Sequence, residues 1–319
     1  MGKIKLIENN SEIGAGTRGS SLGLAALKVA DFNLGTGFFK KNKDAFVVKN
    51  ENVSLQKPSP FLKAKYIDQI FHVCEDISTQ VNNAFQKNSF PILLSGDHSS
   101  AIGTISGIKA ANPSARIGVI WIDAHADLHT PFTTPSGNVH GMSLMAALNF
   151  DNLERRIHEI DHATQQQWDK IKKMGNIYPK ITTDDIVFIG LRSSEDPEDY
   201  FIIENNIKRI GVEEVRRRGH EKISFEVLEY LDACDLIYVS FDVDSLDCDL
   251  ISYGTGTPVP NGLTEQEAGG LINGFLISKK TACFEVVEIN PCLDNKQNKM
   301  AETALRILDR ASSIIEKRG

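Results

Sequence analysis

The chain has 319 residues, of which 41% are hydrophobic and 24% are charged, as is typical of a globular protein in water. Its net charge of -7 argues against nucleic acid and anionic membranes as general partners. No window approaches the roughly 18 apolar residues of a membrane span, and the amino terminus lacks the apolar core of a secretory signal. Five scattered cysteines without paired spacing favour a reduced, cytoplasmic location without structural disulfides.

The chain alternates between apolar runs that predict buried strands and amphipathic stretches that predict helices. A long helix is predicted between Ile67 and Phe85, where apolar residues recur at helical spacing. Residues 31–57 predict a surface loop with one short strand, and residues 143–180 predict outer helices without chemistry. In chain order, the predicted strands are residues 3–7, 45–48, 91–94, 117–122, 186–190, 236–241 and 284–289. Further predicted helices lie at 22–29, after Ser99, after the capping box Thr264–Glu267, and at 300–315.

Strands that are apolar on both faces and alternate with helices imply a parallel sheet covered on both sides. No repeat or linker interrupts the pattern, so we expect residues 1–319 to form a single α/β domain. Ligands of such sheets bind beyond the carboxyl ends of the strands. Acidic and histidine side chains lie at or just beyond the ends of five predicted strands: His98, then Asp123, His125 and Asp127, then Glu195 and Glu198, then Asp242 and Asp244, and finally Glu288.

A metal centre explains these strand ends better than helix capping or a solvated loop does. Asp123, His125 and Asp127 alternate, so on an extended segment their side chains project to one side. Four carboxylates converging without positive charge would repel one another, which favours two divalent ions over one. Oxygen-rich ligation without cysteine favours manganese, or a relative such as cobalt, and two close metals activate water for hydrolysis. The six predicted ligands are His98, Asp123, His125, Asp127, Asp242 and Asp244.

The chain resembles the arginase branch of the ureohydrolase family in six motifs that occur in the family's order. They are SGDHS at 95–99, DAHAD at 123–127, SGNVHG at 136–141, SFDVDSLD at 240–247, GTGTP at 254–258 and VEINP at 287–291. The resemblance implies a three-layer α/β/α sandwich with a mostly parallel eight-stranded sheet and two manganese ions. It further implies hydrolysis of L-arginine to L-ornithine and urea by a homo-oligomer, either a trimer or a hexamer.

The resemblance also implies roles for individual residues. One metal would take His98, Asp123, Asp127 and Asp242, and the other would take Asp123, His125, Asp242 and Asp244, so that Asp123 and Asp242 bridge. Asp127 would relay the proton of the attacking hydroxide. Glu288 would accept hydrogen bonds from the planar guanidinium cation. His140 would carry protons between the site and bulk water, since its ordinary pKa lies near neutrality.

At the far end of the substrate, Thr134, Ser136 and Asn138 resemble the arginase loop that binds the α-carboxylate, which agmatine lacks. Thr257 is also matched to substrate binding. His129 stands where many arginases have asparagine. Glu195 replaces the aspartate that contacts the α-amino group, and Glu198 matches a second acid.

Three other functions stay open. The chain could hydrolyse agmatine or a longer guanidino acid, which would require a rebuilt outer pocket. It could be a dinuclear phosphoesterase, which needs a phosphate-binding cation near the ligand loops, and Arg192 is the one evident candidate. It could also bind metal without turnover, although all six predicted ligands, His140 and Glu288 are present.

Overall fold

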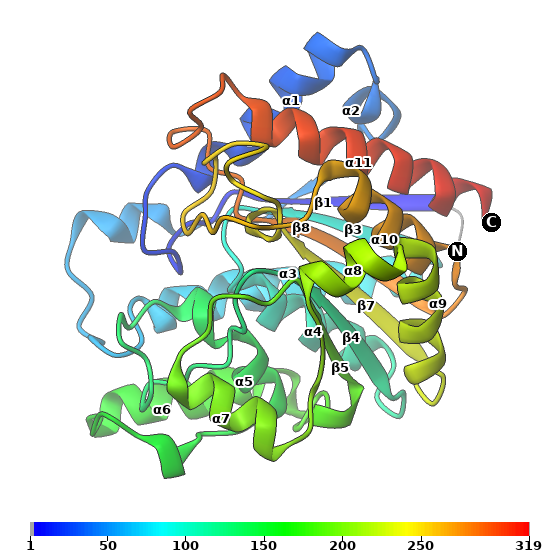
Figure 1. The fold of residues 1–319 in the computed structure, drawn as a ribbon. Helices are drawn as coiled ribbons and strands as arrows, with labels where there is room; N and C mark the ends of the chain where they lie inside the picture. The colour runs from blue at the N-terminus through cyan, green and yellow to red at the C-terminus, as the bar shows by residue number, and fades with distance from the viewer. Residues whose placement is uncertain (1–2, 319) are drawn as a thin grey trace.

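The computed structural model describes residues 3–318, and a parallel eight-stranded sheet runs through it (Figure 1). The strand order is β2-β1-β3-β8-β7-β4-β5-β6, and each neighbouring pair is parallel. This confirms the predicted α/β sandwich with eight strands. The strands are β1 (Lys3–Asn9), β2 (Phe46–Val47), β3 (Ser89–Ser95), β4 (Ile117–Ile122), β5 (Ile186–Ile189), β6 (Lys208–Ile210), β7 (Leu236–Asp242) and β8 (Thr281–Val287).

Helices cover both faces of the sheet and enclose one hydrophobic core on each face. Because side chains alternate along a strand, Leu6 packs towards α1 and α8–α11, whereas its neighbour Ile7 packs towards α3–α7. In Figure 1, α1 and α11 lie above the sheet, and α5, α6 and α7 lie below it. The helices are α1 (Gly23–Leu34), α2 (Phe38–Lys41), α3 (Ile67–Gln86), α4 (Ser100–Ala111), α5 (Ser143–Leu148), α6 (His162–Lys172), α7 (Asp196–Glu204), α8 (Val212–Arg218), α9 (His220–Tyr230), α10 (Glu265–Ile277) and α11 (Lys299–Lys317).

The seven predicted strands are all present, with ends that shift by a few residues. The eighth, β6, was not predicted because it has three residues, two of them charged, and pairs only with β5 at the sheet edge. The prediction of outer helices over 143–180 was wrong for α5, since every residue of Ser143–Leu148 is buried beside α4. Across residues 3–318, no helix is long and apolar enough to cross a membrane.

Local signals explain where several helices begin. Thr264 and Glu267 form the predicted capping box of α10, because each side chain accepts the backbone N–H of the other residue. Glu195 and Glu198 form the same device at the start of α7, which the sequence had not indicated. This second box fixes the segment between β5 and α7, where two predicted substrate-binding acids lie.

Candidate metal centre and adjoining cavity

Three of the four central strands, β3, β7 and β4, deliver the predicted metal ligands to one edge of the sheet, and β8, which lies between β3 and β7, delivers Glu288. Their ends are level, since Ser95 pairs with Val287 and Asp242 pairs with the same valine. His98 follows β3, Asp123 follows β4, and Asp242 is the last residue of β7. The parallel topology therefore brings together side chains that lie more than a hundred residues apart in the sequence.

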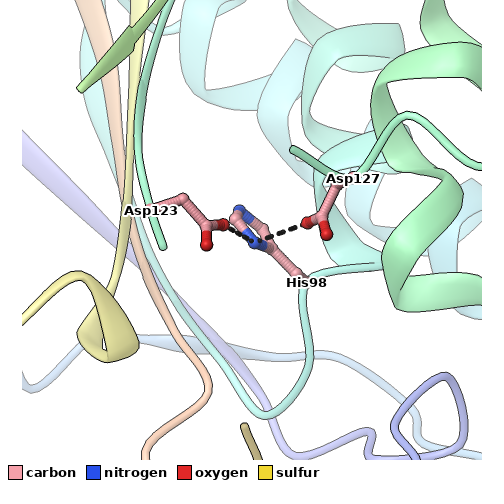
Figure 2. A group of neighbouring side chains, drawn as sticks. All are labelled: His98, Asp123 and Asp127. Carbon is pink, nitrogen blue, oxygen red and sulfur yellow. Dashed lines mark ion pairs between the residues drawn. The ribbon is translucent and has the colours of Figure 1, made fainter. Parts of the chain in front are cut away.

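His98, Asp123 and Asp127 form the first group that can hold a metal ion (Figure 2). His98 Nδ1 lies 3.1 Å from Asp123 Oδ2 and 3.1 Å from Asp127 Oδ2. Asp242 Oδ2 also lies near this nitrogen, at 3.2 Å. Within residues 3–318, the buried atoms His98 Nδ1 and Asp123 Oδ2 have no hydrogen-bond partner. Buried polar atoms normally have partners, so a shared cation fits this arrangement.

Asp123, His125 and Asp244 form a second group that can hold a metal ion. His125 Nδ1 lies 2.9 Å from Asp244 Oδ2 and 3.6 Å from Asp123 Oδ1. Asp123 thus belongs to both groups, with Oδ2 towards His98 and Oδ1 towards His125. This is the geometry that a bridging carboxylate needs. Asp242 contacts His98 and accepts the Asp244 N–H at 2.8 Å, and its own bridging role stays a prediction.

The charged groups at this centre lie close together, and each shifts the pKa of its neighbours. Burial, together with Asp244 and Asp127, raises the pKa of Asp123 to about 6. Burial opposes ionisation of Asp244, yet the neighbouring His125 outweighs it and holds the pKa of that carboxyl below its usual value. Burial likewise lowers the pKa of His125, but Asp244 and Asp123 outweigh it and raise the pKa to about 12. Carboxylates this close together repel one another unless positive charge lies among them, and divalent ions would supply that charge.

Asp127 and Glu288 both adopt left-handed backbone conformations, with φ values of 52° and 67°. Such values are uncommon for residues other than glycine, and for glutamate more so than for aspartate. They turn the chain sharply at the edge of the sheet, and each side chain then reaches the loop of His98. Uncommon backbone conformations of this kind concentrate at functional sites.

Glu288 and His140 adjoin the metal centre. His140 Nδ1 lies 2.9 Å from Glu288 Oε1, which also accepts the backbone N–H of His98 at 3.0 Å. Burial lowers the pKa of His140, but Glu288 outweighs it and raises the pKa to about 9. Among the described residues, none donates a hydrogen bond to Glu288 Oε2. Glu288 is 2% exposed and is not among the residues that line the cavity described next, so its contact with a cationic substrate stays a prediction.

A cavity of about 250 Å³ opens over the metal centre. His140, Pro135, Gly141 and four of the predicted metal ligands, among them Asp127 and Asp244, line it. Ser193 and Ser194 also line it; no role was predicted for them, although their place after β5 could have indicated one. All seven residues predicted to bind the substrate are in its wall: His129, Thr134, Ser136, Asn138, Glu195, Glu198 and Thr257.

The loop 134–138 contains hydroxyl groups that can donate hydrogen bonds to a ligand. Thr134 Oγ1 accepts the N–H of Gly137 at 2.9 Å, and Ser136 Oγ accepts the N–H of Asn138 at 3.1 Å. Each hydroxyl oxygen is thus occupied as an acceptor, and its own hydrogen can point to a ligand. Lys65, which the sequence had not indicated, donates to Asn138 Oδ1 at 3.3 Å. The loop therefore offers donors, as binding of an anionic group requires.

The residues that line the cavity also include one histidine and two acids. His129 Nε2 lies 3.6 Å from Glu195 Oε2 and 3.5 Å from Glu198 Oε2, and burial lowers the pKa of His129. Glu198 accepts the backbone N–H groups of Leu128 and Glu195, and burial raises its pKa to about 7. The side chain of Glu195 is half exposed, so it has more freedom than Glu198 to contact a ligand. Substrate contacts by all three stay predictions.

Two predicted site residues have structural contacts beyond those expected. Thr257 Oγ1 donates to Asp244 Oδ2 at 3.0 Å, so it holds a predicted metal ligand as well as lining the cavity. Within the described part of the chain, the Arg192 guanidinium donates only to backbone carbonyls, which belong to Gly190, Asp244, Ser245, Leu246, Val259 and Pro260. A cation committed in this way is not free to bind phosphate, which disfavours a phosphoesterase.

Comparisons with known proteins agree with this geometry. A sequence model of the Arginase family matches residues 6–313. The arginase of Bacillus subtilis (strain 168) is 31% identical over 309 residues, which are 96% of each chain. The arginase of Bacillus caldovelox is 37% identical over 235 residues, which are 73% of this chain and 72% of that one. The crystal structure of Entamoeba histolytica arginase in complex with L-ornithine matches with a TM-score of 0.82 at 26% identity, covering 98% of each chain.

Proposed function

The chain belongs to the arginase family, and from this premise we propose that it hydrolyses L-arginine to L-ornithine and urea at a centre for two divalent ions. One observation carries the proposal. A single cavity is lined both by four predicted metal ligands, His125, Asp127, Asp242 and Asp244, and by the loop 134–138, whose hydroxyls can donate hydrogen bonds. Arginine has an anionic end for that loop and a guanidinium for the metal end.

The two ions are proposed to be manganese, with cobalt as a possible substitute, because the donor set is oxygen-rich and contains no thiolate. His98 and Asp127 would hold one ion, His125 and Asp244 would hold the other, and Asp123 and Asp242 would serve both. When bound, such a pair lowers the pKa of a water molecule between the ions and supplies a nucleophile near neutral pH. The orphaned atoms His98 Nδ1 and Asp123 Oδ2 support this assignment.

The residues around the centre orient the substrate and move protons. The free Oε2 of Glu288 can accept the guanidinium N–H groups and so place the guanidinium carbon over the metal groups. The Asp127 carboxylate, which faces both His98 and the cavity, takes the proton released by the attacking water. His140 touches Glu288 and lines the cavity, so it can return a proton to the departing amine and exchange with solvent.

The outer wall of the cavity selects the substrate. The hydroxyls of Thr134 and Ser136, with the amide of Asn138, would bind the α-carboxylate, and Glu195 would bind the α-amino group through its exposed carboxylate. Agmatine has no carboxylate to satisfy these donors. A donor loop without its anion loses several hydrogen bonds, so we favour arginine over agmatine as the substrate. The L-ornithine bound in the related E. histolytica enzyme supports an amino-acid product.

The proposal extends to the organisation and location of the protein: a single domain that acts in the cytoplasm as a homo-oligomer.

Product analysis tests the proposed reaction. The metal-stripped protein is reloaded with manganese or cobalt and incubated with L-arginine and with agmatine in parallel. Formation of L-ornithine and urea from L-arginine alone is expected. Urea from agmatine instead would keep the metal centre and replace the substrate, and urea from neither would contradict the proposal.

A further inference from the structure

Lys63 and Lys65 lie in the segment before α3, and this segment packs against the loop 134–138. The N–H of Lys65 donates to the carbonyl oxygen of Gly137 at 2.8 Å. The Lys65 ammonium also donates to Asn138 Oδ1 at 3.3 Å. A β-carbon on Gly137 would lie 3.3 Å from Lys63 Cα. Both lysines therefore adjoin the loop proposed to bind the α-carboxylate, yet neither lines the cavity, and the function proposed above gives them no role.

Lys63 reaches the other end of the same loop through His158. His158 Nε2 lies 2.7 Å from the carbonyl oxygen of Thr134. A carbonyl oxygen can only accept, so this nitrogen carries a hydrogen and donates it. The Lys63 ammonium lies 3.1 Å from the same nitrogen, which has no lone pair left to accept a hydrogen bond from it. The imidazole N–H and the ammonium are thus two donors that lie side by side next to Thr134.

The positive charge of the two lysines is not neutralised within the described part of the chain. Across residues 3–318, no carboxylate forms an ion pair with either ammonium group. Both side chains are partly buried, so water screens their charge less than it would on an open surface. The loop itself contains no charged residue. The two lysines therefore make a loop of neutral hydrogen-bond donors electrostatically positive, which attracts an anionic group.

We propose that Lys63 and Lys65 are specificity-determining residues, which select substrates that carry a carboxylate at the end remote from the guanidinium. The inference rests on the proposed function and deepens it. The hydroxyls of the loop supply directed hydrogen bonds, and the two lysines supply the charge. Arginine brings a carboxylate to this charge, whereas agmatine brings only an ammonium group, which the lysines repel.

A purely structural role for the lysines makes a different prediction. If their side chains only support the loop, then any substitution should weaken carboxylate and amine ligands alike. Lys65→Met keeps the length of the side chain and the backbone N–H but removes the charge, and Lys65→Arg keeps the charge. Lys63→Met removes the other charge. Lys222→Met is the matched control, because Lys222 is an exposed lysine of α9, which packs on the other face of the sheet.

The experiment measures urea release from L-arginine by the manganese-loaded proteins, with L-ornithine and putrescine as inhibitors. Putrescine has the chain and the amines of L-ornithine but no carboxylate. We expect Lys63→Met and Lys65→Met each to raise KM for arginine and the inhibition constant of L-ornithine roughly 3- to 10-fold, as loss of one nearby charge does. Turnover number, manganese content and inhibition by putrescine should not worsen.

Two further comparisons show whether charge is the cause. The differences between each methionine variant and the unaltered protein should shrink at roughly 1 M salt, where the screening length falls to about 3 Å. Lys65→Arg should restore KM to within about twofold of the unaltered value, because the positive charge is kept. Lys222→Met should match the unaltered protein throughout.

An unchanged KM in both methionine variants would overturn the inference. So would equal losses of L-ornithine and putrescine binding, or a rise in KM that neither salt nor Lys65→Arg removes. Each of these results leaves the proposed function standing. Absence of urea from the unaltered protein would instead overturn the proposed function, and that result is obtained before any variant is compared.

Discussion

His140 and Glu288 are joined by a 2.9 Å contact between the imidazole Nδ1 and the carboxylate Oε1. The same oxygen accepts the backbone N–H of His98. The acid proposed to bind the guanidinium is thereby fixed to the histidine proposed to carry protons and to the loop of a metal ligand. Burial lowers the pKa of His140, yet Glu288 outweighs it and raises the pKa to about 9.

This pair makes the stability of the metal-free protein depend on pH. A histidine with a raised folded pKa stabilises the fold fully below its unfolded value of 6.5, and that contribution is lost as pH rises through about 9. Glu288→Gln should return the His140 pKa towards 6.5 and abolish the contribution, which is on the order of 3 kcal/mol. Nuclear magnetic resonance titration of the ring measures the pKa, and denaturant unfolding at pH 6 and pH 9 measures the free energy. Titration of His140 near 6.5 in the unaltered protein would refute this reading.

Asp123 is the residue on which both metal groups depend. Asp123→Ala should reduce metal retained after dialysis at both positions and abolish turnover, because a lost bridge removes a ligand from each ion. Elemental analysis of the dialysed protein gives the metal content. Asp199→Ala, which changes an acid at the molecular surface beyond the cavity, serves as the control and should retain full metal content. Normal metal content in Asp123→Ala would rule out the shared ligand.

Gly137 holds the donor loop in a conformation that no other residue fits. Its φ is +77°, and a β-carbon would lie 2.1 Å from the carbonyl oxygen of Leu62. Gly137→Ala should displace the loop and raise KM for arginine roughly tenfold or more, while manganese binding is unchanged. Gly175→Ala is the matched control, since φ is +74° there and a β-carbon meets nothing within 4 Å. That control should cost about 1–2 kcal/mol of stability and leave KM as it was.

Arg192 tests the phosphoesterase alternative. Its guanidinium donates to six carbonyls around the β7 loop, so Arg192→Lys should lower the free energy of unfolding by at least about 2 kcal/mol. The unaltered protein should not hydrolyse p-nitrophenyl phosphate. Phosphate ester hydrolysis that disappears in a stable Arg192→Lys variant would instead assign the residue to phosphate binding.

The clustering of the predicted metal ligands could be foreseen because a short-range rule places them. An apolar run predicts a strand, alternation places Asp123, His125 and Asp127 on one side, and parallel strands bring their ends together. The surroundings of the buried Glu285, whose carboxylate accepts the hydroxyls of Ser95, Ser100, Thr104 and Tyr238, could not be predicted in this way. These hydroxyls come from β3, α4 and β7, and no pattern in the sequence aligns one strand with another.

Other misses have equally local causes. Strand β6 is three residues long and contains Lys208 and Arg209, so it carries no apolar run to detect. The capping role of Glu198, whose two oxygens accept backbone N–H groups at the start of α7, was not predicted, and its predicted contact with substrate stays a prediction. A capping role and a binding role look alike in a sequence, since both place an acid just after a strand.

The most direct test of the account is a manganese titration of the metal-stripped protein with urea release from L-arginine as the readout. Activity should rise until two equivalents of manganese are bound per chain and then stay constant, since each ion needs its own donor group and both share Asp123. Full activity at one equivalent would contradict the two-metal centre. Absence of urea from arginine at saturating manganese or cobalt would contradict the proposed function itself.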